Sequence, residues 1–338
     1  MPPSIDDLIP LLRTLYPDTD LPAPFDLLAV VHDQRQAKHV AEPLTDKPNR
    51  GLAARAKKVA ALLATPDALL AAVDVASGTL LPDKLITRAE TMLGQLLLGS
   101  LAEQAFEDIY RSTIGTTELA LQDERGARND TDYRVLNGGG RQVFRINIKL
   151  HGARFRKAQE AVGLDPEDCF PLATYKIHQG LIKQEREELP YLWVVIDCPV
   201  AATDLGKLVP RPMVELIALA YASKKIGGKR KIEERVVDHL VTATDHSIAT
   251  KVADLRAQLA KAPWRVISAR RADKLLREKL FERVFAVRVR SFNRSYGGAE
   301  LNMHLSLNQD MTPLEEFLKV MNEKGLHGVT AGLERGTI

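Results

Sequence analysis

The sequence has 338 residues, with 47 Lys and Arg against 44 Asp and Glu, and 45% of its residues are hydrophobic. These proportions are typical of a globular protein with a core and argue against intrinsic disorder. No stretch reaches the roughly 18 apolar residues of a membrane span, and the amino terminus lacks the basic segment of a signal peptide. Only Cys169 and Cys198 are present. We therefore expect no disulfide framework, no zinc site and a cytoplasmic location.

Positive charge is concentrated in one part of the chain. Residues 211–300 hold 20 Lys and Arg against 10 Asp and Glu, whereas residues 1–130 hold 13 against 19. A local positive excess favours a polyanionic partner, so nucleic acid is expected, although a basic surface can also be an ordinary solvated face. Aromatic residues make up only 5% and do not alternate with the basic ones. This favours duplex DNA over a single strand stacked on aromatic rings.

The first half of the chain changes from helical to strand-like patterns. Residues 1–86 read as short helices separated by prolines, and a longer helix is expected from about residue 87 to 110 because its apolar residues recur at three and four. Three strands should follow at 118–122, 131–137 and 143–150. Gly138–Gly140 joins the second and third, and glycine accepts the positive φ angles of a tight hairpin.

The second half is predicted to be mixed. A helix is expected at 171–188 and a buried strand at 191–200, followed by a mainly helical region at 212–279 that contains one strand, WRVIS. Two strands at 284–292 and 301–308 should flank a turn at 295–300, and a capped helix should begin at Thr312. We therefore expect an α/β protein with three parts: a helical region at 1–86, a core of mixed sheet and flanking helices at 87–210, and a basic mixed region at 211–338.

Three polar residues of this core suggest chemistry on a phosphodiester. A period of two along VFRINIKL puts Asn147 and Lys149 on one face of the strand and Ile148 on the other. Across the hairpin, Asp132 should meet that pair. An Asp oxygen and the Ile148 carbonyl can ligate Mg²⁺, for which Mn²⁺ can substitute, and Lys149 can orient water or neutralise charge on the phosphate. Glu103, on the preceding helix, would reach the metal through water.

These residues resemble the PD-(D/E)xK nuclease superfamily over about residues 90–200. The resemblance consists of Gly99, Glu103 and Phe106 in a G-x-x-x-E-x-x-F helix, then Asp132, then the triplet ending in Lys149. It implies a restriction-endonuclease-like core, a metal held by the Asp and the first residue of the triplet, and a catalytic Lys. It also implies endonuclease activity on DNA in restriction or phage defence, by a homodimer or a subunit of a defence complex.

The sequence departs from the family pattern at one position, where the family has Asp or Glu and this chain has Asn147. An amide oxygen can ligate a metal but brings no charge, so a catalytically inactive nucleic-acid-binding or scaffold protein is the alternative prediction. RNA is the alternative substrate. Asp132 can also be an ordinary turn residue, Lys149 an exposed edge residue and Glu103 part of a solvated face, with Glu107 replacing Glu103 if the helix is rotated.

Several basic or polar residues are predicted to contact DNA. One group follows the catalytic strand or lies on the next helix, and the other is a lysine-rich run with two glycines, which suggests a mobile loop that binds phosphates without reading sequence. The predicted DNA-binding residues are Arg154, Arg156, Lys157, Gln179, Lys224, Lys225, Lys229, Arg230 and Lys231.

Overall fold

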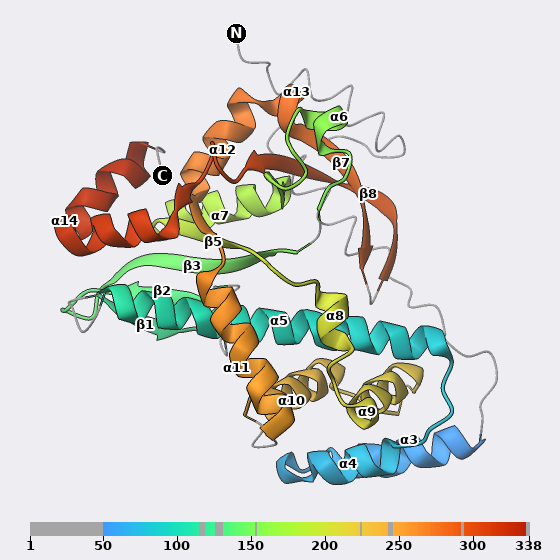
Figure 1. The fold of residues 1–338 in the computed structure, drawn as a ribbon. Coiled ribbons are helices and arrows are strands. Elements are labelled where there is room, and N and C mark those ends of the chain that lie inside the picture. Colours follow the sequence, from blue (N-terminus) through green and yellow to red (C-terminus); the bar gives the residue numbers. More distant parts are fainter. Residues whose placement is uncertain are drawn as a thin grey trace. The chain divides into compact units, whose positions relative to one another are not determined.

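A computed structural model describes residues 50–114, 119–125, 131–152, 154–223, 225–242, 246–291 and 294–335 (Figure 1). They form a mixed α/β protein that divides into two compact units. Unit 1 contains Glu107–Asp197 and Ala262–Ile338, and unit 2 contains the described residues before Glu107 together with Cys198–Lys261. The expected borders at 86/87 and 210/211 both fall within unit 2. The helices expected before residue 50 lie outside the described residues.

Unit 1 is built on a six-stranded sheet in the order β1-β2-β3-β5-β6-β9. Every neighbouring pair is antiparallel except β3 and β5. These two can be parallel because helix α7 (Thr174–Glu187) lies between them in the chain and carries it back across the sheet. The strands are β1 (Ala120–Asp123), β2 (Tyr133–Leu136), β3 (Gln142–His151), β5 (Tyr191–Asp197), β6 (Trp264–Ser268) and β9 (Thr312–Pro313).

The expected hairpin between β2 and β3 is confirmed. The Asn137 amide N–H donates to the Arg141 carbonyl at 2.9 Å, and the Asn137 side chain accepts from the Arg141 amide at 2.9 Å. Gly140 adopts a φ of +76°, a conformation that costs little only for glycine. The register shifts once, between Val135 and Leu136, and beyond this irregularity Tyr133 pairs with Ile146. That register positions the polar residues described below.

A second sheet completes the core of unit 1, with β4 (Cys169–Ala173), β8 (Arg294–Ser306) and β7 (Val284–Ser291) in the order β4-β8-β7. Its apolar residues pack with β5, α7 and α12 (Ala269–Glu278) in one cluster around Trp193. The turn expected at 295–300 is wrong, because β8 runs through this segment and pairs with β7 at Ser295 and Glu300. The register of this ladder shifts between Arg288 and Arg290, opposite the two glycines. Short helices α6 (Ala158–Val162) and α13 (Leu280–Arg283) and the long α14 (Leu314–Arg335) complete the unit.

Unit 2 is helical. Its elements are α3 (Arg50–Leu62), η1 (Pro66–Ala68), α4 (Leu69–Ala76), most of α5 (Asp83–Ile114), α8 (Ala202–Gly206), α9 (Arg211–Ala222), α10 (Lys229–Thr242) and α11 (His246–Lys261). Helices α5 and α8 touch backbone to backbone: a Cβ added to Gly94 would lie 1.9 Å from the Ala202 carbonyl oxygen. Among the described helices, none combines the length and the hydropathy that crossing a bilayer requires.

Candidate functional site

Strands β2 and β3 bring Asp132, Asn147 and Lys149 together on one face of the sheet. Since Tyr133 pairs with Ile146, the preceding residue Asp132 lies beside Asn147, and the Asp132 amide donates to the Ile146 carbonyl at 3.1 Å. Alternation along β3 adds Lys149 to the same face. The Lys149 amine donates a hydrogen bond to the Asn147 amide oxygen. The structure thus gathers the three residues that were expected to carry the chemistry.

The Asp132 carboxylate closes the end of the β2–β3 ladder. Its Oδ2 accepts a hydrogen bond from the Ile148 amide at 2.5 Å, in place of a backbone carbonyl of β2. In a strand, the N–H and C=O of one residue point to the same edge, so the Ile148 carbonyl also lies on the β2 side, past the last backbone pair. A carboxylate and a backbone carbonyl are therefore presented together at this edge.

Burial dominates the electrostatics of Asp132. Removal from water raises the pKa of its carboxyl group, and the Ile148 N–H and the positive charges of Lys149 and Arg125 oppose this effect without cancelling it. Asn147 is also buried, with 7% of its surface exposed, while Asp132 and Lys149 are half-buried. A carboxylate kept partly out of water is stabilised by any further cation that approaches it.

The oxygen donors of this site fit a hard, largely hydrated cation such as Mg²⁺. They are the Asp132 carboxylate, the Ile148 carbonyl and the Asn147 amide, and Mg²⁺ commonly uses one or two carboxylates and keeps several waters. Only one of these donors is charged. Across the described ranges, this site included, no three His, Cys, Asp or Glu side chains are grouped so that they could hold a metal ion.

The two glutamates considered on the long helix lie in different units. Glu103 is half-buried and belongs to unit 2, whereas Glu107 is the first residue of unit 1. The Tyr133 hydroxyl donates to Glu107 at 2.9 Å, and the Arg125 guanidinium lies 3.0 Å from the same carboxylate. Tyr133 alternates with Asp132 along β2, so Glu107 contacts the opposite face of that strand.

Arg154 is held by acidic residues of unit 1. Its Nε lies 2.5 Å from Glu167 and its Nη2 lies 2.6 Å from Asp197, and another guanidinium nitrogen lies 2.7 Å from His151 Nδ1. A phosphate would therefore have to compete with two carboxylates for this side chain. The other predicted DNA contacts of unit 1, Arg156, Lys157 and Gln179, are exposed.

The lysine-rich run of unit 2 is largely helical. Lys224 lies outside the described residues, and Lys225 is exposed. The expectation of a mobile loop is wrong for Lys229, Arg230 and Lys231, because these residues begin helix α10. The buried face of that helix consists of apolar residues at helical spacing, and this spacing fixes where the helix starts. These residues are Ile232, Val236, Val237 and Leu240.

Acidic and aromatic neighbours already engage part of this run. Arg230 pairs with Glu234 at 2.9 Å. The Lys229 amine lies over the Tyr221 ring at 5.6 Å, and burial, with a contribution from the nearby Arg88, lowers its pKa. The positive charge of the run is thus smaller at the surface than its composition indicates.

Sequence reasoning missed the pair formed by His151 and Asp197. The parallel register places them opposite each other at the ends of β3 and β5, with His151 Nδ1 3.3 Å from Asp197 Oδ1. Burial, followed by the charge of Arg154, lowers the pKa of His151. Two features of the sequence point to this pair: His151 lies on the strand face of Lys149, and the apolar strand YLWVVID ends in the acidic residue Asp197.

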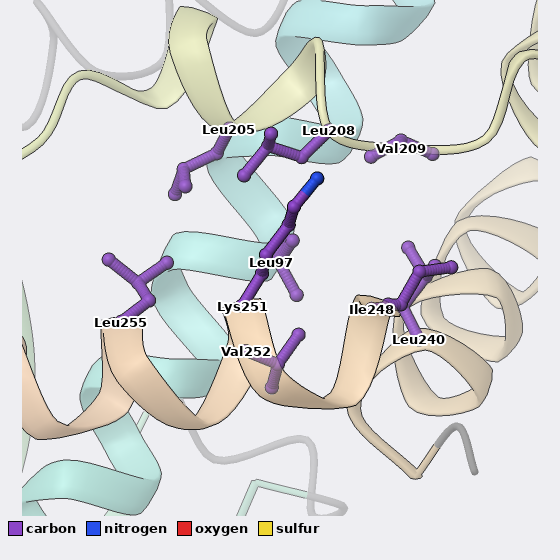
Figure 2. Close-up of a pocket in the computed structure, with 9 residues that line it drawn as sticks. All are labelled: Leu97, Leu205, Leu208, Val209, Leu240, Ile248, Lys251, Val252 and Leu255. Carbon is purple, nitrogen blue, oxygen red and sulfur yellow. The ribbon is translucent and has the colours of Figure 1, made fainter. Parts of the chain in front are cut away.

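Unit 2 also contains a pocket whose lining is almost entirely aliphatic (Figure 2). Its single charged lining residue is Lys251, whose amine points toward Leu208 in Figure 2. None of the predicted site residues lines it, and it offers apolar surface rather than ligands for a metal or a phosphate. The lining residues are Leu97, Leu205, Leu208, Val209, Leu240, Ile248, Lys251, Val252 and Leu255.

Comparison with known proteins adds no relative to this description: the chain matches no protein-family model, no curated protein and no solved structure.

Proposed function

We propose that the protein is a Mg²⁺-dependent endonuclease that hydrolyses phosphodiester bonds in duplex DNA, with a core of the PD-(D/E)xK type. The observation that carries this proposal is the meeting of Asp132, Asn147 and Lys149 on one strand face, with the Ile148 carbonyl at the adjoining edge. The order of helix α5, hairpin β2–β3, helix α7 and strand β5, with α6 and β4 between β3 and α7, supports it, because the resemblance implies helix, hairpin, helix and strand in this sequence.

In this proposal each residue has a separate role. Asp132, Asn147 and the Ile148 carbonyl hold Mg²⁺, which when bound polarises the phosphate and makes a water molecule more acidic. Lys149 lies within hydrogen-bonding reach of Asn147, and its charge is felt at Asp132. From there its amine can orient the attacking water or stabilise negative charge that develops on the phosphate.

One observation favours a second candidate, a nuclease-like protein that binds nucleic acid without cutting it. Asn147 contributes no charge, and its amide oxygen already accepts a hydrogen bond from Lys149. A cation at this site would therefore be held by a single negative charge. The two candidates differ in one measurable respect, because only the first cleaves DNA in the presence of a divalent metal.

Incubation of supercoiled plasmid with the protein and Mg²⁺ or Mn²⁺, with EDTA as the control, tests the proposal. Asp132→Ala and Lys149→Ala should each abolish nicking and linearisation. Lys207→Ala is the matched control, since it removes an exposed lysine of unit 2 that pairs with Asp204 at 2.8 Å. Cleavage by either site variant at the wild-type rate would refute the site, and a folded wild-type protein that binds DNA but never cuts it would favour the second candidate.

The wider context follows from the same proposal. The described residues of each chain hold one such site, and cutting both strands of a duplex at one place needs two, so we propose a homodimer or a subunit of a larger complex. Restriction or defence against phage in the cytoplasm is the context that the family resemblance suggests. Light scattering of the protein with and without a short duplex tests the two-chain arrangement.

A further inference from the structure

Glu124, the residue that follows strand β1, lies on the strand face that carries the candidate site. The Glu124 amide donates to the Asp132 carbonyl at 2.9 Å, which extends the β1–β2 ladder by one pair beyond Asp123 and Tyr133. Residues that lie opposite each other in an antiparallel ladder share a face, and their Cβ atoms are about 4.5–5.5 Å apart. The side chains of Glu124 and Asp132 therefore leave the sheet on the same side, as close neighbours.

The ion pair of Glu124 indicates the same face independently. Its carboxylate lies 3.5 Å from Arg134 Nη2. Arg134 is two residues after Asp132 on β2, so these two side chains share a face. The cross-strand partner of Arg134 is Arg145, which is two residues before Asn147 on β3. One face of three neighbouring strands thus carries Glu124, Asp132 and Asn147.

Glu124 is a buried carboxylate with a loose partner. Only 9% of its surface is exposed, and burial of an ion is costly unless opposite charge and good hydrogen bonds compensate for it. Its contact with Arg134 is longer than the roughly 2.7–2.9 Å of a charge-assisted hydrogen bond. Arg134 Nε, in turn, has no hydrogen-bond partner among the described residues. A divalent cation would compensate the Glu124 carboxylate better than this contact does.

The neighbouring Asp123 differs from Glu124 in both respects. Asp123 pairs with Tyr133, so its side chain leaves the sheet on the opposite face. Its carboxylate is held by the Arg125 guanidinium, with nitrogen–oxygen distances of 2.5 and 2.9 Å. The charge of Asp123 is still felt at Asp132. Asp123 therefore shows what a nearby negative charge does at this site when it cannot be a ligand.

We propose that Glu124 is a further ligand of the divalent cation and supplies the negative charge that Asn147 lacks. This inference rests on the proposed function for the presence of a cation at Asp132, and it gives a role to a residue outside the motif. Ligand oxygens bind Mg²⁺ at about 2.0–2.1 Å, so two of them can lie up to roughly 4 Å apart across one ion. Because glutamate is one methylene longer than aspartate, the Glu124 carboxylate can reach an ion that Asp132 binds. Two carboxylates from adjacent strands would then hold the cation.

Calorimetric titration with Mn²⁺ in the absence of DNA tests this assignment without a cleavage step. Glu124→Gln keeps the shape of the side chain and removes its charge, and Asp123→Asn is the control that removes the same charge from the other face. Residues that only support a metal ligand typically contribute about 10–100-fold to metal affinity, so Glu124→Gln should weaken Mn²⁺ binding by at least ~10-fold. Asp123→Asn should weaken it much less. Melting curves in EDTA establish that both variants fold.

Combination with Asn147→Glu tests whether positions 124 and 147 supply the same charge. A carboxylate at position 147 should tighten Mn²⁺ binding more in the Glu124→Gln protein than in the wild type, where it adds repulsion between ligands. The two substitutions should therefore not be additive. If Glu124→Gln does not fold, Arg134→Gln provides a second measurement. Loss of the Arg134 guanidinium releases the Glu124 carboxylate and should tighten Mn²⁺ binding, and an unchanged or weaker affinity would overturn the assignment.

The outcomes separate this inference from the proposed function. A wild-type protein that binds Mn²⁺ through Asp132, as shown by loss of binding in Asp132→Ala, provides the reference. If Glu124→Gln then loses no more affinity than Asp123→Asn, Glu124 is not a ligand, and the endonuclease proposal is untouched. A wild-type protein that needs Glu124 to bind Mn²⁺ but never cuts plasmid keeps the ligand and refutes the endonuclease. A wild-type protein that does not bind Mn²⁺ at all overturns both.

Discussion

His304 lies on β8 with no exposed surface, stacked on Phe155 with the ring centroids 4.9 Å apart. Its Nδ1 lies 3.3 Å from the Arg283 carbonyl, and its Nε2 has no hydrogen-bond partner among the described residues. Burial lowers its pKa from 6.5 to about 4, despite the backbone contacts that favour the charged ring. The folded protein therefore holds this ring neutral over a pH range in which the unfolded chain protonates it.

The contribution of His304 to the pH dependence of the unfolding free energy follows from the linkage between proton binding and folding. Because the folded pKa is the lower one, the contribution of His304 to stability is complete above pH 6.5 and is lost as the pH falls toward 4. A shift of this size corresponds to about 3 kcal/mol in total, of which about 2 kcal/mol is lost between pH 7 and pH 5. His304→Phe keeps an aromatic ring against Phe155 but cannot titrate, so its free energy of unfolding should fall less steeply over that interval.

Urea unfolding followed by tryptophan emission suits this measurement. The two tryptophans of the chain, Trp193 and Trp264, are both buried in the large sheet of unit 1, the unit that contains His304. The quantity to compare is the change of unfolding free energy with pH in the two proteins, not its absolute value. Parallel curves for wild type and His304→Phe between pH 7 and pH 5 would refute a buried neutral histidine at this position.

Three further predictions follow from the site and its supports. Asn147→Glu should tighten Mn²⁺ binding in calorimetric titration and Asn147→Ala should weaken it, whereas equal affinities would place residue 147 outside the metal shell. Asp132→Asn should raise the unfolding free energy of the metal-free protein at pH 7, because burial raises the pKa of this carboxyl group and disfavours its charged form; the gain should shrink as the pH falls. Gly180→Ala should lower the melting temperature, since the new Cβ would lie 2.8 Å from the Trp193 ring, while Gly99→Ala, with open space around it, should raise stability by up to ~1 kcal/mol.

Local patterns were sufficient to predict the hairpin and the grouping of the polar residues. A period of two fixes which residues share a strand face, and three consecutive glycines indicate where the chain turns, so the meeting of Asp132, Asn147 and Lys149 could be inferred before any fold was known. The helix that became α5 was also found, with its ends four residues short on each side.

Features that depend on distant pairing could not be read from the sequence. Strand β4 is a five-residue segment that contains Pro171, and it is stabilised by β8, which lies more than a hundred residues later. The contact between His151 and Asp197 requires the parallel register of β3 and β5, which no local pattern specifies. The lysine-rich run was misread as a loop because its glycines end at Gly228, just before the apolar period of α10 begins.

The insertion of Cys198–Lys261 between β5 and β6 affects how the protein folds during synthesis. These two strands are antiparallel neighbours in the large sheet, yet the ribosome must make the whole of that segment of unit 2 between them. At roughly 5–20 residues per second this takes on the order of ten seconds. During that interval β5, buried along nearly its whole length in the finished protein, has an open, apolar edge. Strand edges of this kind pair readily with other chains. Nascent chains that are translated together from one messenger RNA would therefore be most prone to aggregate with one another before Trp264 leaves the ribosome.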